Sequence, residues 1–311
     1  MTSIYRDFKT QVELDAAYDV EASVPDFMVY ARQYLESSAQ ARQDLDCDLG
    51  VRFGPSVEEY VDIFPASRPN APVLIFIHGG YWRILSAGDF SFVARGPAQA
   101  DVTVVVANYA LCPKVSISEI TRQMRAMVAW VHRRISSFNG DPENIFVAGH
   151  SAGGHLATMC ALTDWRRDYD LPSNTVRGII PISGVFDLEP IRKTFMQQDL
   201  AISDRDIREV SPQRVVGRCD VPMLISYGGD ELPEFIRQSE DFLQAWKKAG
   251  NKATFFPQLG RNHFNAISDL ADAESSLCKA IFSFMGHLPR DRRRTSGLKP
   301  HRPSSLRAGG Y

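Results

Sequence analysis

Ser151 is the side chain whose surroundings best suit nucleophilic chemistry. It lies in the pentapeptide GHSAG at residues 149–153, which fits the pattern G-x-S-x-G. In that pattern the serine occupies a sharp turn between a strand and a helix, with its hydroxyl exposed for attack. The apolar run NIFVA precedes the turn, and the small residues of AGGHLA follow it. We predict Ser151 as a nucleophile; the alternative is a serine that only caps the helix.

A serine nucleophile requires a base, and a carboxylate must orient that base. On this kind of turn the chain order is serine, acid, histidine, with each partner on a loop after a later strand. Asp230 follows the apolar run LISYGG, and His263 follows the run ATFFPQLG. We therefore predict Asp230 as the acid and His263 as the base. Asp187 remains a rival acid, because Asp230 could instead cap the helix expected near Pro233.

The stretch HGGYW at residues 78–82 is unusual for a surface turn, because two large aromatic residues follow the glycines. Acyl transfer develops negative charge on a carbonyl oxygen, and fixed N–H donors must meet that charge. The residue after the serine and an upstream loop supply such donors on this kind of turn. We predict that Gly79, Gly80 and Ala152 form the oxyanion hole, and that His78 braces the loop.

Tyr81 and Trp82 follow these glycines directly. At the mouth of the site, their rings could stack on a small-molecule substrate with an aromatic or apolar portion. We predict both as substrate-binding residues. The alternative is that both rings simply pack beneath a cap.

Several segments of the sequence have the character of strands that would position these side chains. Each is rich in branched residues, ends in turn signals and alternates with helical segments, as parallel βαβ units do. These segments are residues 60–66, 71–80, 102–110, 144–151, 176–184, 221–230 and 253–260. Between them, Ser116 and Glu119 indicate a capping box that opens a helix. Apolar residues then recur at helical spacing up to Ile135, and NG at 139–140 closes the helix.

We find no internal repeat and no interdomain linker, and therefore expect one α/β domain over residues 1–288. Residues 1–45 and 189–215 have helical character without a strand partner, so we expect cap elements there. Residues 289–311 are expected to form a disordered basic tail, because they lack apolar periodicity and are rich in Arg, Ser, Pro and Gly.

Composition excludes several classes of protein. The chain carries a net charge of −2, and the body without the basic tail is more acidic still, which argues against nucleic acid as a partner. The five cysteines form no CxxC pair, and no HExxH occurs, so we expect no disulfide framework, no metal and no cofactor.

The apolar runs are strand-length and the N-terminus lacks a signal-peptide core, so we expect no membrane partner and a cytoplasmic location. The sequence leaves the oligomeric state open, a homodimer included.

Several of these segments together resemble kynurenine formamidases (arylformamidases), which belong to the hormone-sensitive-lipase-like esterases of the α/β-hydrolase superfamily. The resemblance lies in HGGYW, YALCP (109–113), GHSAGGHLA, SGVFDLEP, EFIRQS (234–239) and NHF, and it spans about residues 10–288. It implies an α/β-hydrolase fold, with a mostly parallel central sheet, helices on both faces and small helical cap elements. It also implies a triad of Ser151, Asp230 and His263, and an oxyanion loop at the HGG glycines.

By this resemblance, the activity would be hydrolysis of an aryl formamide such as N-formylkynurenine to the aromatic amine and formate. A carboxylesterase acting on short acyl esters is the alternative, because such enzymes share nearly the same motifs. A non-catalytic ligand-binding protein with this fold is a further alternative, although such proteins commonly lack a triad residue and all three candidates stand in order here.

Overall fold

A computed structural model describes residues 3–287 of the chain, so the predicted tail at 289–311 lies outside the described residues. At its centre is an eight-stranded sheet with the strand order β1-β2-β4-β3-β5-β6-β7-β8. The strands are β1 Asp48–Arg52, β2 Tyr60–Phe64, β3 Ala71–Ile77, β4 Thr103–Ala107, β5 Gly140–His150, β6 Gly178–Ile182, β7 Met223–Gly228 and β8 Ala253–Gln258. The strands from β4 to β8 in this order pair in parallel, and β1 and β2 add an antiparallel edge.

All of the strands expected from the sequence are present, and they form a mostly parallel sheet, as expected. Strand β1 was not predicted, because its sequence DLGVR is short and mostly exposed at the edge of the sheet. The predicted run at 71–80 was too long, since the strand ends at Ile77 and the HGG segment forms the following loop.

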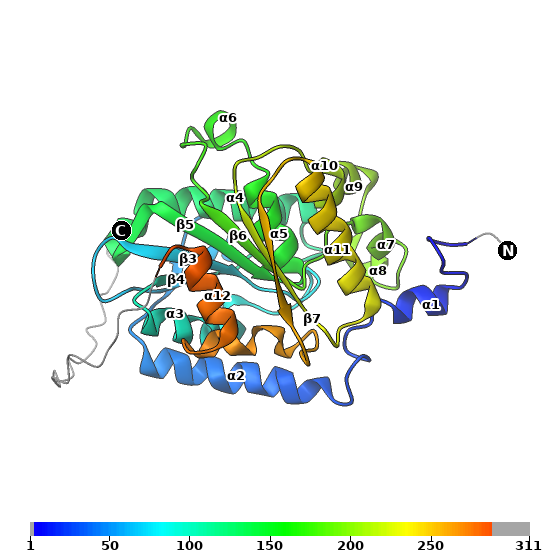
Figure 1. Ribbon diagram of the computed structural model, residues 1–311, viewed down its shortest axis with the longest axis horizontal. Helices are drawn as coiled ribbons and strands as arrows, with labels where there is room; N and C mark the ends of the chain where they lie inside the picture. Colours follow the sequence, from blue (N-terminus) through cyan, green and yellow to red (C-terminus); the bar gives the residue numbers. More distant parts are fainter. Residues whose placement is uncertain (1–2, 288–311) are drawn as a thin grey trace.

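Helices cover both faces of the sheet (Figure 1). They are α1 Gln11–Ala16, α2 Phe27–Asp44, α3 Arg95–Gln99, α4 Ile117–Arg134, α5 Ala152–Ala161, α6 Trp165–Tyr169, α7 Leu188–Arg192, α8 Gln197–Leu200, α9 Asp204–Val210, α10 Pro212–Val215, α11 Pro233–Lys248 and α12 Ser276–Phe284, with the 3₁₀ helices η1 Ala87–Ala94, η2 Ile135–Phe138 and η3 Asn265–Ala271. Helices α4, α5 and α11 lie on one face, and α2, α3 and α12 lie on the other (Figure 1).

Successive residues of β3 point alternately into the two hydrophobic cores, one on each face of the sheet. Val73, Ile75 and Ile77 are fully buried in the core beneath α4, α5 and α11. Leu74 and Phe76 are buried in the second core, with residues of η1 and α12. A strand covered on both faces requires apolar residues at successive positions, which is the pattern that predicted it.

Helix α4 begins and ends near the predicted signals. The Ser116 hydroxyl accepts a hydrogen bond from the Glu119 N–H at 3.2 Å, which caps the helix. The chain leaves the following η2 turn through Asn139, whose φ of 63° is left-handed. Asparagine tolerates this conformation better than most residues, so the NG signal marks the end of the helix correctly.

The two segments expected as cap elements are helical and contribute to one cavity. Residues 1–45 contain α1 and α2, and residues 189–215 contain most of α7 and all of α8, α9 and α10. Seven residues between Tyr18 and Tyr34 line a cavity, and so do Phe195 and residues that follow β3 and β5.

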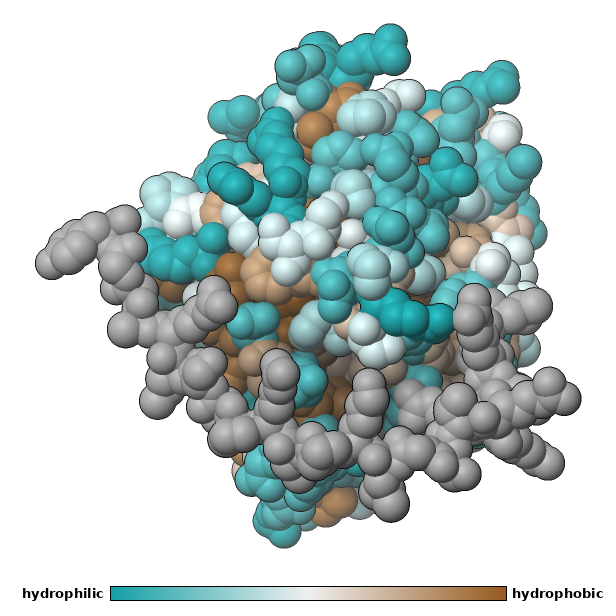
Figure 2. All heavy atoms as spheres, turned by 90° about the vertical axis from the view of Figure 1, so that its left-hand side faces the viewer, coloured by the Kyte–Doolittle hydropathy of each residue, from teal (hydrophilic) through white to brown (hydrophobic). Residues whose placement is uncertain are grey.

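The surface seen in Figure 2 is mainly hydrophilic, with a group of hydrophobic side chains near its centre. None of the helices between residues 3 and 287 has both the length and the apolar character needed to cross a bilayer.

Candidate active site

Ser151 lies on a tight turn between β5 and α5, as predicted. Its backbone has φ 56° and ψ −119°, a combination that is strained for any residue except glycine. The neighbouring glycines make the turn sterically feasible. A Cβ atom on Gly149 would lie 2.1 Å from the carbonyl oxygen of Gly153, and one on Gly153 would lie 1.9 Å from that of Ile77. No larger residue fits at either position without moving the backbone.

The structure places Glu231, and not Asp230, against His263. Nδ1 of His263 lies 2.8 Å from Oε2 of Glu231, and both side chains are buried. The Asp230 side chain is exposed, while its backbone N–H donates to the carbonyl of Arg261 at 2.9 Å. The predicted assignment of Asp230 is therefore corrected: the chain order is right, and the carboxylate is the next residue.

The second oxygen of Glu231 is also fully engaged. Oε1 accepts hydrogen bonds from the Gly228 N–H at 2.7 Å and from the Ser183 hydroxyl. Three donors thus hold one buried carboxylate in a fixed orientation, as a carboxylate that orients a histidine requires. The rival Asp187 is engaged elsewhere, because it caps α7 and pairs with Nε of Arg214 at 3.3 Å.

The HGG loop approaches the nucleophile closely. A Cβ atom on Gly79 would lie 3.1 Å from Cβ of Ser151, and one on Gly80, where φ is +102°, would lie 2.3 Å from the Ile84 carbonyl oxygen. Ala152 is the first residue of α5, where backbone N–H groups have no partner within the helix. The structure therefore brings Gly79 and Ala152 next to Ser151, and Gly80 lines the same cavity. Their role as donors for an oxyanion stays a prediction.

His78 braces this loop, as expected. Its Nδ1 donates to the Gly79 carbonyl at 2.7 Å, and its ring stacks on Tyr109 with centroids 4.2 Å apart. Burial lowers the pKa of His78 to about 4, so the ring is neutral near neutral pH.

The two aromatic residues after the glycines have different positions. Tyr81 lines the cavity, and its hydroxyl donates to the Tyr18 carbonyl at 2.8 Å. Trp82 is fully buried in the core, and its Nε1–H donates to Nδ1 of His155 at 3.3 Å. The prediction that Trp82 binds substrate is therefore wrong. Both residues have positive φ, and this turn carries the second ring into the core.

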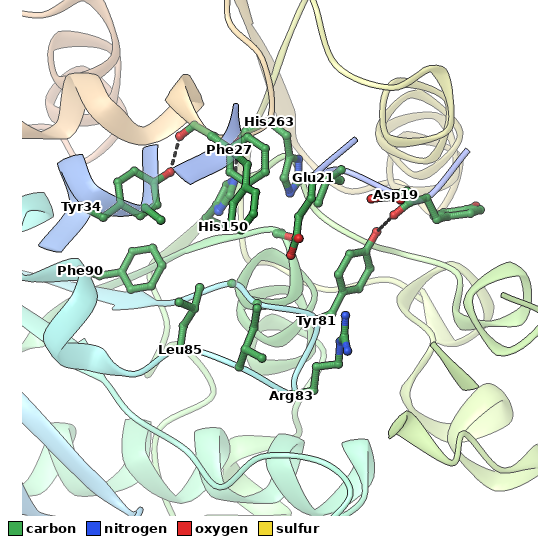
Figure 3. A pocket seen from close by; sticks show the side chains of 18 of the residues that line it. Asp19, Glu21, Phe27, Tyr34, Tyr81, Arg83, Leu85, Phe90, His150 and His263 are labelled. Atoms are coloured by element: carbon green, nitrogen blue, oxygen red, sulfur yellow. Dashed lines mark hydrogen bonds between the residues drawn. The ribbon is translucent and has the colours of Figure 1, made fainter. Parts of the chain in front are cut away.

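The cavity beside Ser151 has a volume of about 240 Å³. Ser151, His150 and His263 reach it, and Figure 3 shows Tyr81, Phe90 and Phe27 among its labelled wall residues. The aromatic side chains of the wall are Tyr18, Phe27, Tyr34, Tyr81, Phe90, Phe195 and Phe264. All of these except Tyr81 were missed from the sequence, and nothing in residues 18–34 links Tyr18, Phe27 or Tyr34 to a motif.

The α/β hydrolase fold family matches residues 74–264, which include all of these candidate residues from the HGG loop to His263. The chain belongs to the α/β-hydrolase family. The predicted fold class is thereby confirmed, and an esterase structure from Pyrobaculum calidifontis shares the fold with a TM-score of 0.66 at 16% identity, covering 89% of this chain and 98% of that one.

Individual relatives show which members of the α/β-hydrolase family this chain is similar to in sequence. The kynurenine formamidase of Danio rerio is 31% identical over 256 residues, which cover 79% of this α/β-hydrolase and 85% of the relative. The kynurenine formamidase of Salmo salar is 30% identical over 261 residues, which cover 81% of this chain and 86% of the relative. A solved structure titled a putative thioesterase from Silicibacter sp. is 30% identical, with a TM-score of 0.78 over 86% of this chain and 98% of that one. The chain is thus a kynurenine formamidase-like hydrolase, as the sequence motifs predicted.

Proposed function

We propose that this hydrolase cleaves an aryl formamide to the aromatic amine and formate, with N-formylkynurenine as the type of substrate. The observation that carries the proposal is one cavity that joins Ser151 and His263 to a largely aromatic wall. The similarity to kynurenine formamidases supports the same substrate class.

In the first step, the Ser151 hydroxyl attacks the formyl carbon and its proton moves to Nε2 of His263. Nδ1 of His263 is already engaged by Glu231, so Nε2 is the ring nitrogen left for the hydroxyl. Glu231 stabilises the imidazolium that forms. The developing oxyanion would accept hydrogen bonds from the N–H groups of the HGG loop and of Ala152.

In the second step, the imidazolium returns its proton to the nitrogen of the leaving amine while the C–N bond breaks. The formyl group remains on Ser151 as an ester. Water then attacks this ester with His263 as the base, and formate leaves.

Two carboxylates at the cavity suit the ammonium group of an amino acid substrate. Asp19 and Glu21 line the cavity with Arg83, whose guanidinium pairs with Asp199 at 2.7 Å. The α-ammonium group of a substrate such as N-formylkynurenine could therefore meet carboxylates, while its aromatic ring contacts Phe90 or Phe264.

Labelling with a fluorophosphonate probe, together with formate release from N-formylkynurenine, tests the proposal. The wild-type protein should be labelled and should release formate, and Ser151→Ala should do neither. Equal labelling of the two proteins would show that the nucleophile is another residue. Absence of formate release by the labelled wild type would refute the formamidase assignment.

A carboxylesterase for short acyl esters is the second candidate. It is supported by relatives such as the esterase LipC of Mycobacterium tuberculosis, which is 27% identical over 71% of this chain and 60% of the relative. Esters and formamides would use the same nucleophile, so substrate preference separates the two functions.

We also propose that the protein acts in the cytoplasm. All five of its cysteines, Cys47, Cys112, Cys160, Cys219 and Cys278, are free thiols, which suits a reducing compartment. Cell fractionation would test this location.

A further inference from the structure

His150 is a buried residue of the cavity that the mechanism above does not use. It precedes Ser151, it is 5% exposed, and it lines the cavity beside the nucleophile. Its ring packs on that of His263, with centroids 4.7 Å apart. Its side chain therefore lies beside the space that a substrate reaching both Ser151 and His263 would occupy.

A backbone contact fixes the tautomer of His150. Nε2 lies 2.8 Å from the carbonyl oxygen of His263. Because a carbonyl oxygen can only accept, Nε2 carries the hydrogen, and Nδ1 of the neutral ring is left with a free lone pair. Burial, and then the nearby charge of His263, lower the pKa of His150 well below its ordinary value, so the ring is neutral near neutral pH.

The free nitrogen lies near both the nucleophile and the oxyanion loop. A Cβ atom built on Gly79 would lie 3.2 Å from Nδ1 of His150 and 3.1 Å from Cβ of Ser151. The space beside Gly79 is thus bordered by both His150 and Ser151. Within residues 3–287, no protein group donates a hydrogen bond to this nitrogen.

A bound formamide would present complementary groups to these residues. Its carbonyl oxygen would be directed to the N–H donors of the HGG loop and Ala152, and its nitrogen must lie near His263, which protonates it. The remaining polar group is the amide N–H, which requires an acceptor once water is excluded. The Nδ1 lone pair would repel the oxyanion, so it also favours the orientation in which the N–H faces His150.

We propose that Nδ1 of His150 accepts a hydrogen bond from the N–H of the scissile formamide and thereby makes the site selective for amides over esters. An ester has an oxygen in place of this N–H, and its lone pairs would face the lone pair of Nδ1. This inference rests on the proposed function, and it assigns His150 a role in substrate specificity.

The test compares formanilide with phenyl formate, which share the formyl group and the phenyl ring and differ only in N–H against O. The variant is His150→Gln, because glutamine can still donate to the His263 carbonyl while lacking an acceptor at the position of Nδ1. We expect kcat/KM for formanilide to fall on the order of tenfold, as for one lost hydrogen bond in a buried site, with a much smaller change for phenyl formate. His132→Gln on α4 is the matched control and should change neither substrate.

N-methylformanilide provides a second measure, because it lacks the N–H. The wild-type protein should discriminate strongly between formanilide and its N-methyl derivative, and His150→Gln should discriminate much less. Retained hydrolysis of phenyl formate by the variant shows that it has folded.

Equal losses on formanilide and phenyl formate would overturn the inference, because they would show that His150 only positions His263. Unchanged rates on both would overturn it as well. In either case the wild type would still hydrolyse formanilide, and the proposed function would stand. If wild-type protein hydrolyses phenyl formate but not formanilide, both the inference and the formamidase assignment fail.

Discussion

His263 and Glu231 form a buried hydrogen bond, with 2.8 Å between Nδ1 and Oε2, whereas the Asp230 side chain beside them is exposed. The adjacent acids therefore have different roles. We expect Glu231→Gln to lower kcat by a factor on the order of 10⁴, as loss of the orienting carboxylate does in other triads. Asp230→Asn, the matched control, should change kcat less than about threefold, since solvent surrounds its side chain. Steady-state kinetics on an aryl formamide would contradict the assignment if the aspartate variant were the impaired one.

Ser183 supports the orienting carboxylate from the loop after β6. Its hydroxyl donates to Oε1 of Glu231, and the Gly228 N–H donates to the same oxygen. Ser183→Ala removes one of the donors, so we expect kcat to fall by about three- to tenfold with little change in KM, the scale of one typical hydrogen bond. A large rise in KM with an unchanged kcat would show that Ser183 acts on substrate binding instead.

Trp82 should affect stability more than substrate binding. Its ring is fully buried, and its N–H donates to His155. Trp82→Phe leaves Nδ1 of His155 without a donor and also removes buried volume, so we expect a loss of about 2 kcal/mol in the free energy of unfolding. Urea denaturation measures this loss. A large increase in KM for aromatic substrates with unchanged stability would restore the original prediction that Trp82 binds substrate.

Buried histidines should make the fold sensitive to acid. Burial lowers the pKa of both His78 and His155 from 6.5 to about 4. Between these values the unfolded chain binds protons that the folded protein does not, so the free energy of unfolding must fall as the pH drops from about 6.5 toward 4. Urea midpoints at pH 7.5 and pH 5 would show this decrease, and His155→Gln should make it smaller. A midpoint that is equal or higher at pH 5 would contradict the prediction.

Most of the site could be predicted from the sequence, because the residues that signal it lie close together in the chain. Ser151 stands in a motif whose glycines are required by the turn, and His263 follows from chain order. The acid was misplaced by one residue, because the direction of each side chain depends on how the turn after β7 packs. In that turn, the Asp230 N–H bonds to Arg261 in the loop that precedes His263.

Other features depended on packing that no local pattern encodes. The position of Trp82 follows from positive φ at both Tyr81 and Trp82, which is unfavourable for aromatic residues and is therefore not expected from the sequence. The cavity wall contributed by residues 18–34 depends on how the N-terminal segment folds back across the sheet.

We expect the site to prefer formyl groups on aromatic amines. A Cβ atom on Gly79 would lie 3.1 Å from Cβ of Ser151, so we expect little room for a longer acyl chain between the HGG loop and the nucleophile. The most direct measurement is kcat/KM for formyl, acetyl and butyryl derivatives of aniline and of phenol. We predict that formanilide exceeds acetanilide by at least on the order of tenfold, the scale of discrimination for one methyl group in a fitted pocket, and that butyranilide is slower still. Faster turnover of phenyl butyrate than of phenyl formate, together with slow hydrolysis of formanilide, would contradict the account and identify the protein as a carboxylesterase.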